Sequence, residues 1–288
     1  MTTPPIQWYP GHIAKAEKAL SEQLKRVDVI LEVRDARIPL ATHHPKVQNW
    51  VGSKTRVLVL NRMDMILPPA QQLWQKWFKE QGQETYFTNA QDGTGVAAVA
   101  RVAQKAGVEI NQRRKNRGML SRPVRAVVIG FPNVGKSALI NRLLKRRVVE
   151  SAARPGVTRQ LRWLRISEQI ELLDAPGVIP GKLDDQSAAL KLAICDDIGD
   201  ASYDNQRVAA TLVELIKHLL TTSAPGVLPS NPLLSRYELD PTPISGEEYL
   251  HNLALTRYQG DVERTARQLL TDFRKGFLGA IPLELPPR

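Results

Sequence analysis

The sequence predicts an α/β fold with a mainly parallel sheet, followed by a smaller region built only of helices. Segments rich in Val, Ile and Leu are expected to form strands at residues 27–33, 56–60 and 124–129. Helical patterns lie between these segments, and strands that alternate with helices are typical of parallel sheets. After residue 180, amphipathic segments follow one another without a strand pattern. Because ligands of such sheets bind where the strands end, functional residues are expected there.

The remaining elements follow from local patterns. Pro10 and Gly11 force a turn, and the Ala-rich and Leu-containing residues after them predict a first helix. Further strands are expected at residues 85–88, 161–166 and 169–173, and further helices at 70–81, 138–144, 187–198, 205–222, 245–258 and 262–277. Ser245 and Asp261 are suited to cap the last two of these helices.

Composition excludes several classes of protein. No stretch of the 288 residues is apolar for long enough to span a membrane. The first residues lack a charged segment followed by an apolar core, so no signal peptide is predicted. Cys195 is the single cysteine, which excludes an intramolecular disulfide and a zinc site built from cysteines. A lone cysteine also suits a reducing compartment, so we expect a cytoplasmic protein.

The net charge of +11 is concentrated in one part of the chain. Residues 101–165 hold 17 Lys and Arg against two acidic residues, whereas the rest of the chain holds 23 basic and 27 acidic residues. Nucleotide phosphates alone need only one or two cations, so this clustering favours binding to RNA or DNA over a merely solvated basic face. Residues 109–123 are expected to be a basic connector that contacts RNA.

A glycine-rich pattern, G-x-x-x-x-G-K-S, occupies residues 130–137 between a predicted strand and a predicted helix. This is the P-loop pattern, in which backbone N–H groups and a helix N-terminus surround phosphate oxygens. Lys136 can reach the β- and γ-phosphates and so takes part in catalysis, and Ser137 can offer its hydroxyl to Mg²⁺. The phosphate-binding residues predicted here are Asn133, Val134, Gly135, Lys136, Ser137 and Ala138. The protein is therefore expected to bind a nucleoside triphosphate.

A second motif, Asn61-Arg62-Met63-Asp64, follows directly after a predicted strand. It resembles the guanine-specificity motif N-K-x-D of GTPases. Asp64 can accept hydrogen bonds from guanine N1–H and its amino group, and adenine lacks that donor edge, so ATP is disfavoured. Arg62 replaces the usual Lys, although its flat guanidinium could still cover the base. Asn89 and Ala90, after the next strand, would form the loop that supports the base.

Two further motifs fit the switch regions of a GTPase. Thr158 follows Pro155-Gly156-Val157, where a switch loop would place a hydroxyl on Mg²⁺. Asp174-Ala175-Pro176-Gly177 ends a predicted strand and matches the D-x-x-G motif. Its Asp174 would hold Mg²⁺ through water, and the Gly177 N–H would sense the γ-phosphate.

The base-recognition motif precedes the P-loop, an order that a circular permutation of the GTPase sheet would produce. The chain closely resembles the RbgA/YlqF family of circularly permuted ribosome-biogenesis GTPases. The resemblance rests on the P-loop, the two switch motifs and three further stretches, which are Trp8–Ala16, Asp28–Pro39 and Phe273–Gly279. Other permuted GTPases carry zinc-binding cysteines, which this chain lacks.

The resemblance implies a GTPase that acts late in assembly of the large (50S) ribosomal subunit. It implies binding to the subunit precursor and to 23S rRNA, turnover stimulated by that particle, and GTP and Mg²⁺ as ligands. Val178 stands where Ras-like enzymes place a water-orienting Gln, so the free protein is expected to be slow. In this family a His of the Trp-Tyr/Phe-Pro-Gly-His motif, here His12, has been proposed for that role. Asn133 matches the P-loop Asn that helps to hold K⁺ in related GTPases.

The predicted organisation is a permuted GTPase domain over residues 1–182, a connecting helical segment over 183–204, and a helical domain over 205–288 that contacts RNA or the ribosome. That last unit could equally serve packing or dimerisation, although we expect a monomer. Two other functions stay open at this point. One is a non-catalytic RNA-binding factor locked by GTP, which Val178 favours and Lys136 opposes. The other is an ATP-dependent enzyme, which Asp64 opposes.

Overall fold

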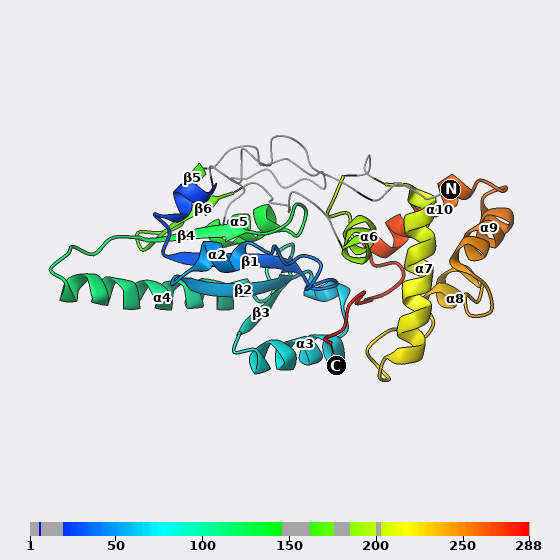
Figure 1. Ribbon diagram of the computed structural model, residues 1–288, viewed down its shortest axis with the longest axis horizontal. Helices are drawn as coiled ribbons and strands as arrows, with labels where there is room; N and C mark the ends of the chain where they lie inside the picture. Colours follow the sequence, from blue (N-terminus) through cyan, green and yellow to red (C-terminus); the bar gives the residue numbers. More distant parts are fainter. Residues whose placement is uncertain (1–5, 7–19, 146–161, 176–184, 200–202, 288) are drawn as a thin grey trace.

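The computed structural model describes residues 6, 20–145, 162–175, 185–199 and 203–287 (Figure 1). Among these residues no helix is both long enough and apolar enough to cross a bilayer.

A six-stranded sheet lies at the centre, with strand order β3-β2-β1-β4-β6-β5. The strands are β1 Val29–Asp35, β2 Thr55–Asn61, β3 Thr85–Thr88, β4 Val124–Ile129, β5 Arg162–Arg165 and β6 Ile170–Asp174. Neighbouring strands run parallel except β5 and β6, which form an antiparallel hairpin. The mainly parallel sheet predicted from the sequence is confirmed.

The register of the sheet brings several polar residues to one edge. Asp35 pairs with Asn61, and Asn61 pairs with Thr88, so β1, β2 and β3 end together. Strand β4 ends earlier, and the chain turns away at Gly130, where a Cβ would lie 2.2 Å from the main-chain oxygen of Val33. Only glycine permits so close an approach of the P-loop to β1.

Helices cover both faces of the sheet, and β1 and most of β4 are therefore buried on both sides. The helices of this part are α2 Val47–Val51, α3 Pro68–Glu80, α4 Val96–Asn116 and α5 Lys136–Leu144. Alternate residues of β1 belong to different clusters: Leu31 packs in the core that includes α4 and α5, and Ile30 packs with α2. The aromatic residues of α3 form a third cluster against the end of β2.

The connector predicted over residues 109–123 is wrong in its first part, because residues 109–116 continue α4. The helix is held by a stripe of small apolar residues that packs on the sheet, including Val99, Ala103 and Ala106. Gly107 allows the closest approach, since a Cβ there would lie 2.3 Å from Val124 Cγ2. In Figure 1, α4 runs along the sheet and extends beyond the amino end of β4.

The C-terminal part of the described chain is helical, as predicted. It contains α6 Gln186–Ile194, α7 Asn205–Thr222, α8 Pro232–Tyr237, α9 Gly246–Arg257 and α10 Val262–Arg274. The predicted caps are confirmed, because Ser245 accepts from the Glu248 N–H and Asp261 accepts from the Arg264 N–H. Helix α10 ends at Arg274, before the predicted 277, because the left-handed Gly276 (φ 76°) cannot continue it.

The helical region joins the sheet through α6 and through the C-terminal tail. One continuous core links residues of the sheet with those of α6, α7, α9 and α10. After α10 the chain returns to α3 (Figure 1), and the N–H groups of Leu283 and Glu284 donate to the main-chain oxygen of Arg37. The carboxylate of Glu284 accepts from the Leu40 N–H at 2.7 Å and from Lys191 Nζ at 3.1 Å. The domain boundaries at 182 and 204 stay a prediction.

Candidate nucleotide site

Asn61, at the carboxyl end of β2, ties together three segments of the sheet edge. Its Nδ2 donates to the main-chain oxygen of Val134 in the P-loop at 2.8 Å. Its Oδ1 accepts from Thr88 Oγ1 and from the Ala90 N–H, both at 3.0 Å. The side chain is buried, so each of these hydrogen bonds is shielded from water. Asn61 therefore fixes the P-loop against the loop after β3.

The P-loop is bent to fit this arrangement. Gly135 lies in the left-handed region (φ 97°), and a Cβ there would lie 2.0 Å from Asn61 Nδ2. Helix α5 begins at the next residue, and no side chain caps its first N–H groups. Those groups and the helix dipole favour an anion at this point.

Lys136 is the buried cation of the loop. Its Nζ donates to the main-chain oxygen of Phe131 at 2.6 Å. Burial lowers the pKa of Lys136 to about 8, although the nearby carboxylates of Asp174 and Asp197 oppose that shift. A phosphate placed at the start of α5 would give the ammonium group an anionic partner in place of a carbonyl.

Mg²⁺ fits the donors that lie beside this lysine. Ser137, on the first turn of α5, offers a hydroxyl oxygen, and Asp174, at the end of β6, offers a buried carboxylate. Hard oxygen donors of this kind suit Mg²⁺, which keeps most of its other positions for phosphates and water. Among the described residues, no cluster of three or more His, Cys, Asp or Glu could hold a metal by itself.

Asp64 and Met63 lie just beyond Asn61, in a single turn of 3-10 helix formed by Met63–Met65. The carboxylate of Asp64 is exposed and makes no hydrogen bond or ion pair with any described residue. The main-chain oxygen of Met63 accepts from Gln71 Nε2 at 2.9 Å, which ties this turn to α3. Asp64 is thus held on a fixed turn with its oxygen atoms available to a ligand.

Arg62 adopts a left-handed conformation (φ 63°) that turns its side chain toward the P-loop. Its Nη2 donates to the main-chain oxygen of Asn133 at 2.7 Å, and its Nη1 contacts Asp35 Oδ2 at 3.1 Å. The sequence suggested instead that the guanidinium could cover a base. The structure gives the guanidinium a connecting role between β1, β2 and the P-loop.

The loop after β3 contains Asn89 and Ala90. The Ala90 N–H is taken by Asn61, and its main-chain oxygen accepts from Arg142 Nε at 3.3 Å. The Asn89 side chain stabilises its own turn, donating to Asp92 Oδ2 and accepting from the Gln91 N–H. Ala138 lies half-buried on α5 and packs against the core.

Asn133 connects the P-loop to the helical region. It takes a left-handed conformation (φ 56°), and its Nδ2 donates to the main-chain oxygen of Asp196 at 2.6 Å. Its amide oxygen remains the only atom of this side chain that could coordinate K⁺.

A buried charge network beside these loops is missing from the sequence-based list of site residues. Asp35 accepts from Arg37 Nη2 at 2.7 Å and from Arg62 Nη1 at 3.1 Å. Burial alone would raise the pKa of Asp35, but Arg37 and Arg62 hold it below its usual range. The main-chain oxygen of Cys195, at the end of α6, accepts from both arginines. The sequence signal that could have revealed this network is the pair Asp35 and Arg37, which flanks Ala36 at the end of an apolar strand.

Asp197 is the other unforeseen member of this region. Both of its carboxylate oxygens are buried without a hydrogen-bond partner among the described residues. Burial and the neighbouring Asp35 raise the pKa of Asp197 well above its usual value. Burial without a hydrogen-bond partner among the described residues thus disfavours the ionised form of this carboxyl group.

Three predicted site residues lie outside the described residues, namely His12, Thr158 and Gly177. The residues brought together are Asn61, Arg62, Asn133, Val134, Gly135, Lys136, Ala90 and Asp174. These residues lie together at the carboxyl ends of the strands, and their roles toward GTP stay a prediction.

Comparisons with known proteins agree with this geometry. A family model described as a 50S ribosome-binding GTPase matches residues 125–224. Ribosome biogenesis GTPase A of Bacillus cereus is 34% identical, and the match covers 98% of this chain and 94% of that relative. The protein of the same name from Priestia megaterium is 33% identical, with coverage of 98% and 97%.

A solved structure shows the same fold. The crystal structure of GNP-bound YlqF from T. maritima matches with a TM-score of 0.64 and 22% identity, covering 94% of this chain and 98% of that one. Together with the strand order and the position of Asn61 before the P-loop, this match confirms the circularly permuted GTPase fold. The chain belongs to the family of ribosome biogenesis GTPase A.

Proposed function

We propose that this protein is a GTP-hydrolysing assembly factor that acts late in biogenesis of the large (50S) ribosomal subunit. In this proposal it binds the subunit precursor and 23S rRNA, turns GTP over slowly alone, and is stimulated by the particle. It works as a monomer in the cytoplasm, with the helical domain over residues 205–288 contributing to particle binding. Its relatives named ribosome biogenesis GTPase A supply the process.

One observation carries the nucleotide part of the proposal. The buried Asn61 links the P-loop to the loop after β3, while Asp64, on the next turn, keeps an exposed carboxylate. A purine that bonds to Asp64 is therefore held in fixed relation to phosphates at the start of α5. Guanine offers two donors to a carboxylate and adenine does not, so GTP is preferred.

The phosphate chemistry follows from the start of α5. Lys136 and the uncapped N–H groups stabilise charge on the β- and γ-phosphates. Ser137, Thr158 and, through water, Asp174 would hold Mg²⁺, which neutralises charge on those phosphates. The Gly177 N–H would contact the γ-phosphate. Val178 cannot orient water, so His12 is proposed to do so when the particle is bound.

The experiment measures GTP and ATP hydrolysis in K⁺ buffer, with and without purified large subunits. Wild type is expected to hydrolyse GTP slowly, to be stimulated by subunits, and to leave ATP nearly untouched. His12→Ala should lose the stimulation but keep GTP binding. If subunits bind the GTP form without stimulating it, the protein is a GTP-locked binding factor instead.

Base specificity is tested with Asp64→Asn, which should lower affinity for GTP and raise it for xanthosine triphosphate. Glu80→Gln removes an exposed carboxylate at the C-terminal end of α3 and serves as the matched control. A GTP affinity that is equal in Asp64→Asn and in wild type would contradict the assigned base site.

A further inference from the structure

Helix α4 presents a mainly polar face to solvent, with Val108 as its apolar member. Arg101, Lys105, Val108, Gln112 and Lys115 recur at spacings of three or four residues, so they lie on one side of the helix. All five are exposed, and the opposite side packs on the sheet. At 1.5 Å per residue this outer face runs for about 21 Å from Arg101 to Lys115.

Most of the charge on this helix has no ion-pair partner among the described residues. Arg101, Lys105, Arg113, Lys115 and Arg117 form no ion pair with any described residue, and Glu109 is the only acidic residue of α4. Other arginines of the same domain are paired, for example Arg122 with Asp28 at 2.7 Å and Arg34 with Glu32 at 2.7 Å. The outer face of α4 therefore lacks ion-pair partners in the part of the chain that the structure describes, and an anionic partner would supply them.

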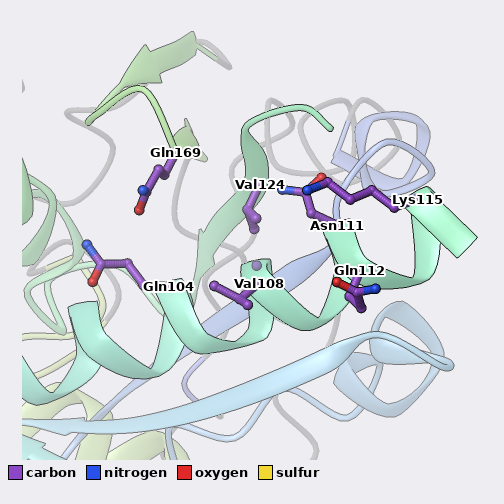
Figure 2. Close-up of a pocket in the computed structure, with 8 residues that line it drawn as sticks. Gln104, Val108, Asn111, Gln112, Lys115, Val124 and Gln169 are labelled. Atoms are coloured by element: carbon purple, nitrogen blue, oxygen red, sulfur yellow. The ribbon is translucent and has the colours of Figure 1, made fainter. Parts of the chain in front are cut away.

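A groove of about 200 Å³ runs beside this face, between α4 and the strands next to it. It is lined mainly by amide side chains with one cation and apolar contacts, among them Gln104, Val108, Asn111, Gln112, Lys115 and Gln169. Figure 2 shows the α4 residues along one side and Gln169, from the turn between β5 and β6, on the other. Amide groups both donate and accept, so the groove can bond to hydroxyl and phosphate oxygens alike.

The groove is built on rigid elements. Asn111 is fixed by two hydrogen bonds to Arg122. Asn111 Nδ2 donates to the main-chain oxygen of Arg122 at 2.9 Å, and the Arg122 N–H donates to Asn111 Oδ1 at 3.1 Å. The close packing of Gly107 on Val124 holds the helix against β4. A partner would therefore meet a surface that needs no rearrangement.

We propose that the outer face of α4 and its groove dock the backbone of double-stranded RNA. The inference rests on the proposed function, since it names the surface by which the protein would hold ribosomal RNA. The row of unpaired cations matches a phosphate backbone. The amide groove matches the 2′-hydroxyls of the shallow minor groove of A-form RNA. Residues 96–116 contain no aromatic side chain on which unpaired bases could stack, which disfavours single strands.

The test compares wild type with Arg101→Gln/Lys105→Gln/Lys115→Gln. The matched control is Lys25→Gln/Lys76→Gln/Lys79→Gln, which removes the same charge from other exposed positions. The probes are a 20-base-pair RNA duplex, its single strand, the same duplex in DNA, and purified 23S rRNA, measured by fluorescence anisotropy over a range of salt concentrations. Basal GTP hydrolysis reports that each variant is folded.

Wild type should bind the RNA duplex more tightly than the single strand or DNA. The α4 variant should bind the duplex at least about tenfold more weakly, with a salt slope shallower by about two to three, while the control keeps the wild-type slope. Gln104→Ala/Gln112→Ala should reduce the preference for RNA over DNA and leave the salt slope unchanged.

Other outcomes overturn the inference in distinguishable ways. If wild type binds 23S rRNA and the α4 variant binds it equally well, another surface holds RNA and the proposed function survives. If the α4 variant no longer binds intact large subunits but still binds protein-free RNA, α4 docks an acidic ribosomal protein. If wild type binds neither RNA nor subunits, the proposed function fails as well.

Discussion

Asn133 of the P-loop donates from Nδ2 to the main-chain oxygen of Asp196 at 2.6 Å, so the phosphate-binding loop is bonded directly to the end of α6. The main-chain oxygen of the preceding residue, Cys195, accepts from Arg37 and Arg62. Arg274 of α10 donates to the main-chain oxygens of Ala193 and Ile194 in the same turn. The end of α6 is thus the point where the nucleotide loops and the C-terminal helices meet.

Replacing Gly135 by Ala should abolish tight GTP binding. The new Cβ would overlap Asn61 Nδ2, and φ of 97° is strained for any other residue. We expect GTP affinity to fall by at least about tenfold, corresponding to the 1–3 kcal/mol typical of such strain. The measurement is a fluorescent-nucleotide titration. Gly118→Ala, at φ of 71° with open space around it, is the control and should bind GTP normally.

Arg62→Ala should weaken nucleotide binding because the Arg62 side chain is bonded to the P-loop. The change removes the donor to Asn133 O and one of the two cations on the buried Asp35. Hydrogen bonds to charged groups contribute about 1.5–3 kcal/mol, so a loss of about tenfold or more is expected. Arg62→Lys should recover part of it. Arg267→Ala, an exposed helix ion pair, should change nothing. Equal affinities in all three variants would contradict the connecting role.

Glu32 should make the fold sensitive to acid. Burial would raise its pKa, but Arg34, His43 and Arg56 together lower it from 4.5 to about 2. A carboxyl group with a lowered folded pKa stabilises the fold above its unfolded pKa, and that contribution is lost as pH falls from about 4.5 toward 2. Urea unfolding over this pH range should show the loss.

Glu32→Gln is the companion variant for this measurement. It should cost about 3 kcal/mol at pH 7, because Arg34 is left buried beside a neutral partner. Its stability should also depend less on pH between 4.5 and 2 than that of wild type. A variant with the same slope as wild type would assign the acid sensitivity to other carboxyl groups.

Gly107→Ala should destabilise the protein although alanine is the better helix former. The Cβ would lie 2.3 Å from Val124 Cγ2, and overpacking of this kind costs about 1–3 kcal/mol. That cost exceeds the gain of about 1 kcal/mol from helix propensity. Thermal unfolding should show a lower midpoint for the single variant. Gly107→Ala should lower the midpoint less in a Val124→Ala background than in wild type, because Val124→Ala removes the methyl group that the new Cβ would overlap.

Local sequence patterns were enough for much of the fold. Residues 124–129 form the predicted strand without a change of boundary, and Asn205–Thr222 form the predicted helix. Strong periodicity and capping residues such as Asp261 act within a few residues, so they can be recognised without the rest of the chain. Helix α4, Val96–Asn116, was not predicted, and its charged second half was assigned to a connector, because the helix depends on packing Ala103 and Gly107 on the sheet.

The sequence by itself determined the phosphate and base motifs, since Lys136, Ser137 and Asp64 act within short segments of fixed spacing. Only the tertiary structure decided how these segments are joined. Asn61 meets Val134 across 73 positions, and Arg37 meets Cys195 across 158. Such contacts depend on strand order and on buried charges finding partners, which no local pattern encodes.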